Sequence, residues 1–408
     1  KVIKYLSLSY CYYMARSKYW ISNCKLPQYI YKKNNQIYLQ TWHGTPLKRL
    51  AHDIQLEEGA SFYRSRMTAD QMVHTYDVDV AKYTYMISPN HFSTEVFQSA
   101  FRINRERLIE TGYPRNDILS NYTEKDKQDV LKKYGLPANK KIILYAPTWR
   151  GAQYKEPEAD LQEVYKLIHK VQQSVDEKEY QVLVKLHQAV YRYLKEQEQE
   201  PAEEKVKFIP ATMDANEILS VTDVLISDYS SIFFDYLNTG KPVVFYIPDA
   251  GSFEEYRGVY ASLENLPGPT AATLEEVGKI FKDLSAAVKP YQQKYQETRR
   301  KFCPKDDGRA CQRITDIVFG KEKEQKQVMS DKTDKVKVLV YAGAFGETNS
   351  TKEFESFLEK VDFSRMDVTL IGNGSGRESA EEKLNTLPKE VRVLYWKRSY
   401  PATDEEYV

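Results

Sequence analysis

A histidine that directly follows an apolar run is the first residue with catalytic potential. His43 lies in the segment QTWHGTPLK, at residues 40–48, next to Gly44 and Thr45. Imidazole titrates near neutrality, so His43 could accept a proton from a substrate hydroxyl. Gly44 would let a substrate approach the backbone closely. The alternative is a structural histidine that only bonds a neighbouring turn.

A second histidine follows another apolar run, in the sequence VKLHQ. Lys185 and His187 are two residues apart, so they point to the same side of an extended chain. Two such cationic or switchable groups on one face suit a pyrophosphate. A hydrogen-bonded structural histidine remains the alternative here too.

Serines at the start of a predicted helix form a third candidate site. The run DVLISDYSSIFFDYL has an apolar strand that ends at Ser227 and Asp228, followed by Ser230 and Ser231 and an apolar helix. Free N–H groups at a helix start bind phosphate, and serines there also serve as ordinary caps. Either interpretation places a helix start at the carboxyl end of a strand, where parallel sheets bind ligands.

Three loops combine an arginine with turn-forming residues. They contain Arg115 with Asn116, Thr148 with Trp149 and Arg150, and Arg257 with Gly258. The guanidinium fork suits phosphate, and the Thr148 hydroxyl with nearby amides could cradle it. Arg115 could instead pair with an aspartate to pin its turn, and Trp149 could stack on a base or fill the core. The glycine-rich segment at residues 372–376 departs from the dinucleotide pattern and indicates a plain turn.

Short apolar runs alternate with longer amphipathic stretches, which predicts parallel sheets covered by helices. The strands are expected at Ile37–Thr41, Thr84–Ser88, Arg107–Thr111, Lys141–Ala146, Gln181–Leu186, Val206–Ile209, Asp223–Ser227 and Pro242–Tyr246. The clearest helices are expected at Asp160–Val175 and Ala215–Val221. Each motif above then lies near a strand's carboxyl end or a helix start.

The same alternation predicts the domain organisation. We expect one α/β domain over residues 1–122, a second over 123–320, and a charged linker at 321–335. Residues 336–408 predict the start of a further glycosyltransferase-like domain, with strands at Val336–Tyr341, Asp367–Ile371 and Val391–Trp396 and a helix at Ser350–Val361. The chain starts with Lys1 and stops within a pattern, so we expect a fragment whose first domain lacks one or two strands.

The amino-acid composition indicates a globular protein. A content of 41% hydrophobic and 29% charged residues is typical of a globular protein. Residues 1–50 carry nine Lys or Arg, no Asp or Glu and ten aromatic residues, which favours an anionic partner or, equally, a solvated basic face. The four cysteines lack zinc or disulfide spacing and fit a reducing cytoplasm. No apolar run is long enough to span a bilayer.

Taken in order, the motifs resemble the CDP-glycerol glycerophosphotransferase family, which comprises teichoic acid glycerol-phosphate and ribitol-phosphate polymerases and primases. The matching segments are QTWHGTPLK, TGYPRND, LYAPTWR, VKLH, DVLISDYSSIFFDYL, TGKPVVFY and YRG. They span about residues 17–320. Family members usually read KLHP where this chain has Gln188, which puts the turn after His187 in question.

The resemblance implies two facing Rossmann-like domains of the GT-B type, with the active site in the cleft between them. It implies His43 and His187 as essential histidines, and Gly44, Thr45, Arg115 and Asn116 on the acceptor side or in the cleft. It also implies donor binding by a larger set: Thr148, Trp149, Arg150, Lys185, Ser227, Asp228, Ser230, Ser231, Arg257 and Gly258.

The implied substrates are a CDP-alditol donor, glycerol or ribitol, and an undecaprenyl-linked glycan or teichoic acid acceptor. The reaction is an in-line phosphoryl transfer that releases CMP, with His43 as base. No metal-ligand cluster is visible, so we expect no metal and no cofactor. We expect a peripheral protein on the cytoplasmic face of the bacterial membrane, with no nucleic-acid partner; an oligomer stays possible.

Two other functions remain open at this stage. A nucleotide-sugar glycosyltransferase of the same fold would release a nucleoside diphosphate instead of CMP. A degenerate nucleotide- or polymer-binding scaffold would lack turnover, although both histidines are present.

Overall fold

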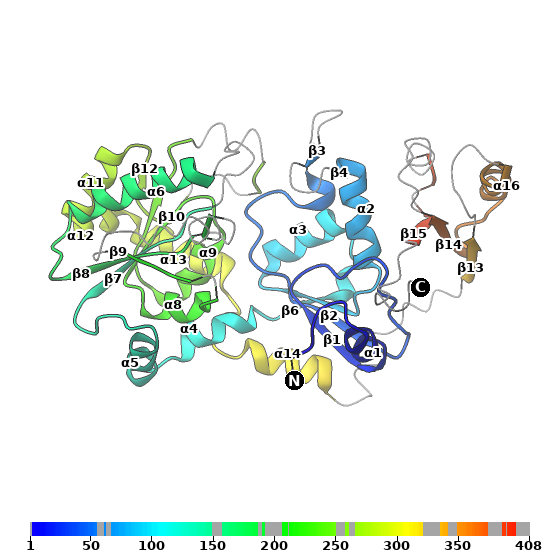
Figure 1. Ribbon diagram of the computed structural model, residues 1–408, viewed down its shortest axis with the longest axis horizontal. Helices are drawn as coiled ribbons and strands as arrows, with labels where there is room; N and C mark the ends of the chain where they lie inside the picture. The colour runs from blue at the N-terminus through cyan, green and yellow to red at the C-terminus, as the bar shows by residue number, and fades with distance from the viewer. Residues whose placement is uncertain are drawn as a thin grey trace, which may run out of the picture.

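Parallel β-sheets organise the chain (Figure 1). The computed structural model describes residues 2–54, 61–62, 67–148, 157–186, 190–191, 206–210, 212–249, 258–260, 266–320, 335–341, 349–373, 386–388 and 390–396. Within these residues, sheets of four, six and three parallel strands follow one another along the chain. A two-stranded antiparallel pair, β3 (Ser61–Phe62) and β4 (Met67–Thr68), lies apart from them.

The first sheet has the strand order β1-β2-β5-β6. Its strands are β1 (Tyr19–Ser22), β2 (Ile37–Gln40), β5 (Tyr85–Ser88) and β6 (Leu108–Glu110). Successive side chains of β2 point to opposite faces, as a pleated strand requires. Tyr38 packs in a cluster with residues of α2 (Ala69–Val80) and α3 (His91–Phe101), whereas Ile37 and Leu39 pack in a second cluster on the opposite face.

The second sheet has the order β12-β11-β10-β7-β8-β9. In chain order its strands are β7 (Lys141–Tyr145), β8 (Tyr180–Val184), β9 (Val206–Phe208), β10 (Val224–Ser227), β11 (Val243–Tyr246) and β12 (Thr270–Ala271). The strands β10 and β11 are buried along their whole length, because helices cover both faces of the sheet.

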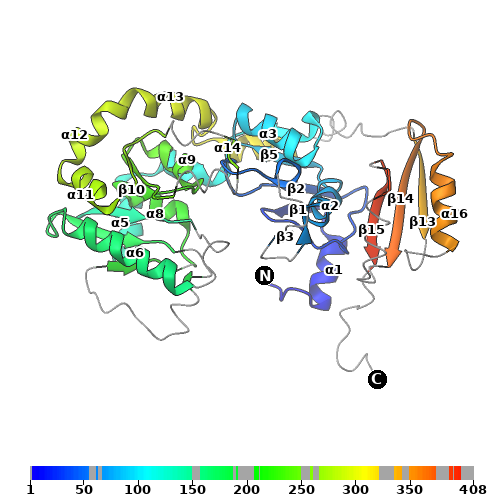
Figure 2. The same cartoon turned by 90° about the horizontal axis from the view of Figure 1, so that it is seen from above.

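Helices on the two faces of the second sheet belong to different apolar clusters. One cluster includes residues of α5 (Glu124–Lys133), α8 (Ala215–Val221) and α9 (Ile232–Tyr236). The other includes residues of α6 (Pro157–Gln172) and α11 (Leu274–Lys282). Figure 2 shows α6 and α11 together beside this sheet.

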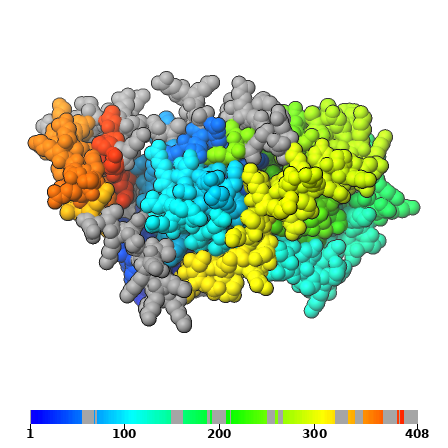
Figure 3. All heavy atoms as spheres, turned by 180° about the vertical axis from the view of Figure 1, so that it is seen from behind, coloured from blue at the N-terminus to red at the C-terminus, as the bar shows by residue number. Residues whose placement is uncertain are grey.

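The chain returns from the second sheet to the first near residue 310. After α12 (Leu284–Val288) and α13 (Gln292–Phe302), α14 (Ala310–Phe319) packs Ile314 and Val318 against the β2 and β5 face of the first sheet. In Figure 3 the yellow atoms of this segment run across both parts of the molecule. This helix packs against the first sheet although it lies inside the range 123–320 that we expected for the second domain. The division into domains stays a prediction.

A third sheet follows, with β13 (Val336–Tyr341), β14 (Met366–Asn373) and β15 (Arg392–Trp396). The helix α16 (Asn349–Leu358) packs Phe354 and Leu358 against Val368 and Leu370 of β14. Its assignment as the start of a further glycosyltransferase-like domain stays a prediction.

The predicted α/β class with parallel sheets is confirmed, and eight predicted strands of the first two sheets have counterparts that differ at their ends by at most a few residues. We did not anticipate β1, in which only Trp20 is buried, or the two-residue strand β12. Both are sheet edges, where an apolar pattern is weakest. The helix α1 (Leu8–Arg16) buries no residue and also carried no clear pattern.

Candidate functional site

The loop after β2 holds His43 in one orientation. Its Nδ1 lies 3.1 Å from the carbonyl oxygen of Asn23, and its ring stacks on buried Trp42 with a centroid distance of 4.2 Å. A carbonyl oxygen only accepts, so Nδ1–H donates and Nε2 keeps its lone pair. This tautomer leaves Nε2 as the proton acceptor.

The surroundings of His43 favour the neutral imidazole. The residue as a whole remains exposed, but packed groups around the ring remove part of its hydration, and this lowers its pKa. The positive charge of Arg115 lowers the pKa further, whereas the Asn23 carbonyl opposes the shift. A neutral histidine near pH 7 is the form that a general base requires.

The loop after β2 that carries His43 contacts the second domain through Gly44. A Cβ atom on Gly44 would lie 2.7 Å from Ser231 Oγ, next to the start of α9, so the two segments are in direct contact. The hydroxyl of buried Tyr113 donates to the Gly44 carbonyl oxygen over 2.9 Å, and Thr45 is also buried. The loop that carries His43 therefore lies beside Ser231, one of the serines that we expect to bind donor phosphate.

Asp228 joins the carboxyl ends of two neighbouring strands. Its carboxylate accepts from the Thr148 N–H at 2.8 Å and from the Thr148 hydroxyl at 2.7 Å. This pairing fixes the loop after β7 against the end of β10. The hydroxyl of Ser227, also fully buried, has no hydrogen-bond partner within the described residues. Asp228 thus acts as a support of the Thr148 loop.

The start of α9 differs from the capping that the serines suggested. Ser231 is the N-cap residue but makes no side-chain capping bond to the described residues, and only the Ile232 N–H reaches Ser230 Oγ, at 3.4 Å. Some amides at this helix start are therefore not satisfied by a serine cap, and an anionic ligand is a suitable partner for such groups.

Lys185 follows β8 directly and is half-buried. Burial lowers its pKa, and the carboxylate of Asp214 opposes this shift. Gly258 adopts a positive φ of +62° and contacts the Arg49 side chain. Trp149, Arg150, His187 and Arg257 lie outside the described residues, so their predicted roles stay predictions.

A buried polar junction fixes the first sheet's loops against α9. The Arg115 guanidinium contacts Asp235 of α9 at 2.8 Å, and the Asn116 amide donates to Asp235 at 3.0 Å and to Asp306 at 2.8 Å. Asn238 donates to the same Asp306 oxygen at 2.9 Å. Asn116 is only 1% exposed and its amide holds the junction together, and its predicted place on the acceptor side or in the cleft stays a prediction.

Sequence reasoning missed the partners that hold this site. It anticipated an aspartate beside Arg115 but not Asp235, a carboxylate inside an apolar helix, whose position was the available signal. Asp306 and the Asn23 carbonyl carried no signal, because each becomes important only through a contact distant in sequence. Asp117 is the nearest aspartate to Arg115 in the sequence, but it accepts from the Ala310 and Cys311 amides at the start of α14.

Alanine substitutions at two glycines with positive φ would test how tightly the junction is packed. Gly112 has φ of +79°, and a Cβ there would lie 2.5 Å from the Lys305 carbonyl oxygen. Gly240 has φ of +72°, and a Cβ there would meet no atom of the described residues within 4 Å. We expect Gly112→Ala to lower the free energy of unfolding by at least about 3 kcal/mol, since strain and overlap add. Gly240→Ala, the matched control, should cost about 1 kcal/mol from backbone strain alone. Equal losses in urea unfolding would contradict the close packing at Gly112.

Comparison with known proteins identifies the family. The sequence profile described as CDP-Glycerol:Poly(glycerophosphate) glycerophosphotransferase matches residues 1–320. The chain belongs to this glycerophosphotransferase family. Teichoic acid poly(glycerol phosphate) polymerase of Bacillus subtilis is 35% identical over 78% of this chain and 42% of the relative. The Staphylococcus epidermidis polymerase is 34% identical over 77% of this chain and 43% of the relative, so the chain spans less than half the length of these two glycerophosphotransferases.

Solved structures of the family have the same fold. The wall teichoic acid polymerase TagF matches with a TM-score of 0.67 and 33% identity, over 80% of this chain and 77% of that one. A histidine variant of TagF soaked with CDPG matches with a TM-score of 0.68 and 32% identity over the same shares. These matches confirm the predicted family and the predicted α/β fold of glycerophosphotransferases.

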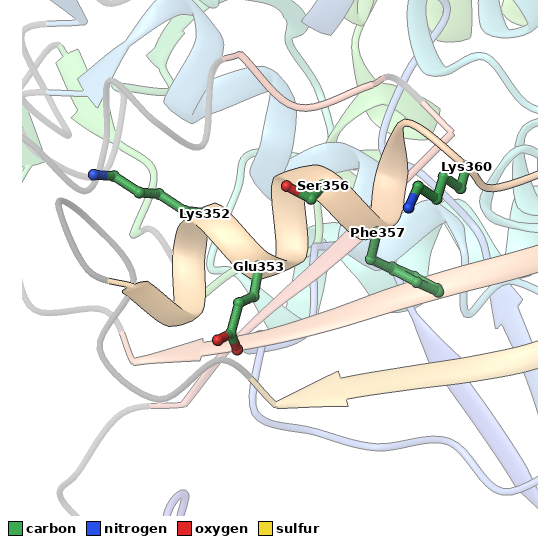
Figure 4. Close-up of a pocket in the computed structure, with 5 residues that line it drawn as sticks. All are labelled: Lys352, Glu353, Ser356, Phe357 and Lys360. Carbon is green, nitrogen blue, oxygen red and sulfur yellow. The ribbon is translucent and has the colours of Figure 1, made fainter.

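Other features of the described residues lie away from this site. No group of three His, Cys, Asp or Glu within the described residues could hold a metal ion, and the expectation of no metal stays a prediction. A shallow depression is lined by Lys352, Glu353, Ser356 and Phe357 of α16 and by Lys360 just after this helix, none of which is a candidate site residue (Figure 4).

Proposed function

We propose that the chain transfers glycerol phosphate from CDP-glycerol to the terminal hydroxyl of a lipid-linked or poly(glycerol phosphate) acceptor, with release of CMP. The observation that carries this proposal is the contact between the His43 loop and the Ser231 end of α9. It brings a neutral base beside the segment expected to hold donor phosphate. Relatives with 31–35% identity are named glycerol-phosphate enzymes, whereas ribitol-phosphate relatives share 23–29%, which favours glycerol over ribitol.

In the proposed step, the acceptor hydroxyl oxygen attacks the β-phosphorus of the donor and His43 Nε2 takes its proton. The bond between that phosphorus and the bridging oxygen breaks, and CMP leaves with the bond's electron pair. Lys185, with His187 and Arg257 as predicted from the sequence, balances the charge of the pyrophosphate. Positioning and charge stabilisation supply most of the rate enhancement in such transfers.

Calorimetric titration with CDP-glycerol, CDP-ribitol and UDP-N-acetylglucosamine tests the donor. We expect CDP-glycerol to bind at least about tenfold more tightly than the UDP-sugar, and CMP to appear only when acceptor is added. Tighter binding of CDP-ribitol would mean that ribitol phosphate is transferred instead of glycerol phosphate, by the same reaction. Preference for the UDP-sugar would replace the proposal with a glycosyltransferase, and no binding of any donor would favour a scaffold.

We further propose that the basic start of the chain rests on the anionic membrane carrying the acceptor, on the cytoplasmic face. The exposed large hydrophobic residues there are Val2, Tyr5, Leu6, Leu8, Tyr12, Tyr13, Ile21, Tyr29 and Tyr31. They accompany basic residues such as Lys4 and Arg16, a composition that suits anionic headgroups. No described helix is long and apolar enough to cross a bilayer. Binding to phosphatidylglycerol vesicles should weaken with salt; salt-independent binding would contradict this surface.

A further inference from the structure

The connection between β11 and β12 sends a short segment onto the first domain. Gly258, Val259 and Tyr260 form an antiparallel bridge with the residues that directly follow the His43 loop, and Lys48 pairs with Val259. The Arg49 N–H donates to the Gly258 carbonyl oxygen at 3.1 Å, and the Tyr260 N–H donates to the Leu47 carbonyl oxygen at 2.8 Å. In Figure 3 the green atoms of this segment lie against blue atoms of the first domain.

The side chain of Tyr260 extends this bridge into the first domain. Its hydroxyl donates to Asp53 Oδ2 over 2.6 Å and accepts from the Leu50 N–H over 3.1 Å. The ring packs against the cluster that contains Trp42, the residue on which His43 stacks. Asp53 is itself held, because its other oxygen accepts from Ser99 of α3 at 2.6 Å.

Close packing on both sides of this bridge restricts it to a single conformation. Gly258 has a positive φ, and a Cβ there would lie 2.7 Å from Arg49 Cδ, so both strain and overlap disfavour another residue. Leu47 is 3% exposed and packs in the second sheet's core, although its chain belongs to the first domain. Residues 47–50 are therefore held by the second domain through both apolar and polar contacts.

We infer that Tyr260 is a positioning residue that couples the donor-side connection to the His43 loop. This inference rests on the proposed function. A bridge of two backbone hydrogen bonds is weak by itself, so the two bonds of the Tyr260 hydroxyl hold the segment in place. Misplacement of a catalytic group by about 1 Å can lower a rate by about a hundredfold. Tyr260 itself does not contact the reacting atoms. It fixes the position of His43 relative to a bound donor.

The test compares Tyr260→Phe with Tyr295→Phe. Both remove one hydrogen-bonded tyrosine hydroxyl, but Tyr295 donates within the second domain, to the Leu237 carbonyl oxygen at 3.2 Å. For Tyr260→Phe we expect kcat to fall about 10- to 100-fold while the Kd for CDP-glycerol changes by less than about threefold. Tyr295→Phe should leave kcat within about threefold of wild type. An unchanged kcat in Tyr260→Phe, or an equal loss in both variants, would overturn the inference.

Asp53→Ala supplies the second half of a double-mutant cycle. It should reproduce the loss of kcat, and the double variant should lose little more, because both changes break one interaction. Additive losses would mean that the two residues act separately and would contradict the coupling.

An activity-independent measurement separates this inference from the proposed function. Amide hydrogen exchange of residues 47–53 should speed up in Tyr260→Phe and not in Tyr295→Phe. Faster exchange supports the bridge even if the wild-type chain releases no CMP, an outcome that would reject only the function. Unchanged exchange would reject the inference that the Tyr260 hydroxyl holds the bridge, whatever the activity.

Discussion

Turnover should fall by about a thousandfold when His43 is replaced with alanine, while the chain still binds CDP-glycerol with nearly wild-type affinity. The imidazole is the group whose Nε2 is free to accept the acceptor's proton, because Nδ1 donates to the Asn23 carbonyl oxygen. The donor-binding residues that we propose lie elsewhere, mostly at strand ends of the second sheet. The measurements are CMP release and calorimetric titration of the same preparation.

His91→Ala is a matched control for this prediction. His91 belongs to the same domain and is also exposed, with a 76% exposed side chain that lies 3.4 Å from Glu95 on its own helix. Its replacement should leave turnover within about threefold of wild type. Full activity in His43→Ala, or loss of donor binding in proportion to turnover, would remove His43 from the proposed role.

The pH profile of the wild-type chain reports on the same imidazole. The pKa of His43 is lowered from 6.5, so the neutral form persists at more acidic pH than for an ordinary histidine. The acidic limb of kcat/KM should therefore fall below pH 6.5, with activity lost as the pH drops and the ring gains a proton. An acidic limb at higher pH would assign the essential base to another group.

The second large effect is expected at Asp306. Its carboxylate accepts from the Tyr113 N–H at 3.1 Å, from Asn116 at 2.8 Å and from Asn238 at 2.9 Å. The Asp306→Ala variant would remove the acceptor of the buried Tyr113 N–H. It would also remove one of the two acceptors of the Asn116 and Asn238 amides, which each keep a bond to Asp235. We expect the free energy of unfolding to drop by on the order of 4 kcal/mol in urea.

Asp307 provides the neighbouring control. Its side chain is 54% exposed and pairs with Arg313 at 2.9 Å, so Asp307→Ala should cost less than about 1 kcal/mol. Similar losses for the two variants would show that the junction does not depend on the buried carboxylate. Asp306→Ala should also lower turnover, because Tyr113 links the junction to Gly44 and thus to His43.

The sequence alone predicted the parallel sheets and the position of the His43 loop for a physical reason. Runs such as Ile142–Tyr145 are buried on both faces, so their apolar pattern is continuous and easy to recognise. Polar motifs that follow such strands must meet at one edge of the sheet. The contact of Thr148, which follows β7, with Asp228, which follows the neighbouring strand β10, agrees with that expectation.

The parts that could not be predicted depend on contacts between distant segments. Asp306 looks no different from Asp307 in the sequence, yet one is buried and the other exposed. Arg115 was expected to bind phosphate or to pin a turn, and it pairs across the junction with Asp235. The bridge of Tyr260 to residues 47–50 likewise joins positions more than two hundred residues apart.

The return of α14 to the first sheet has a consequence for how the protein is synthesised. Ile314 and Val318 cover the face formed by Ile37, Leu39, Tyr85 and Ile87. A growing chain therefore displays that apolar face from the time β5 is made until the ribosome has added more than two hundred further residues. Long-range closure of this kind slows folding and leaves time for aggregation, so folding yield should depend on chaperones or on expression at low temperature.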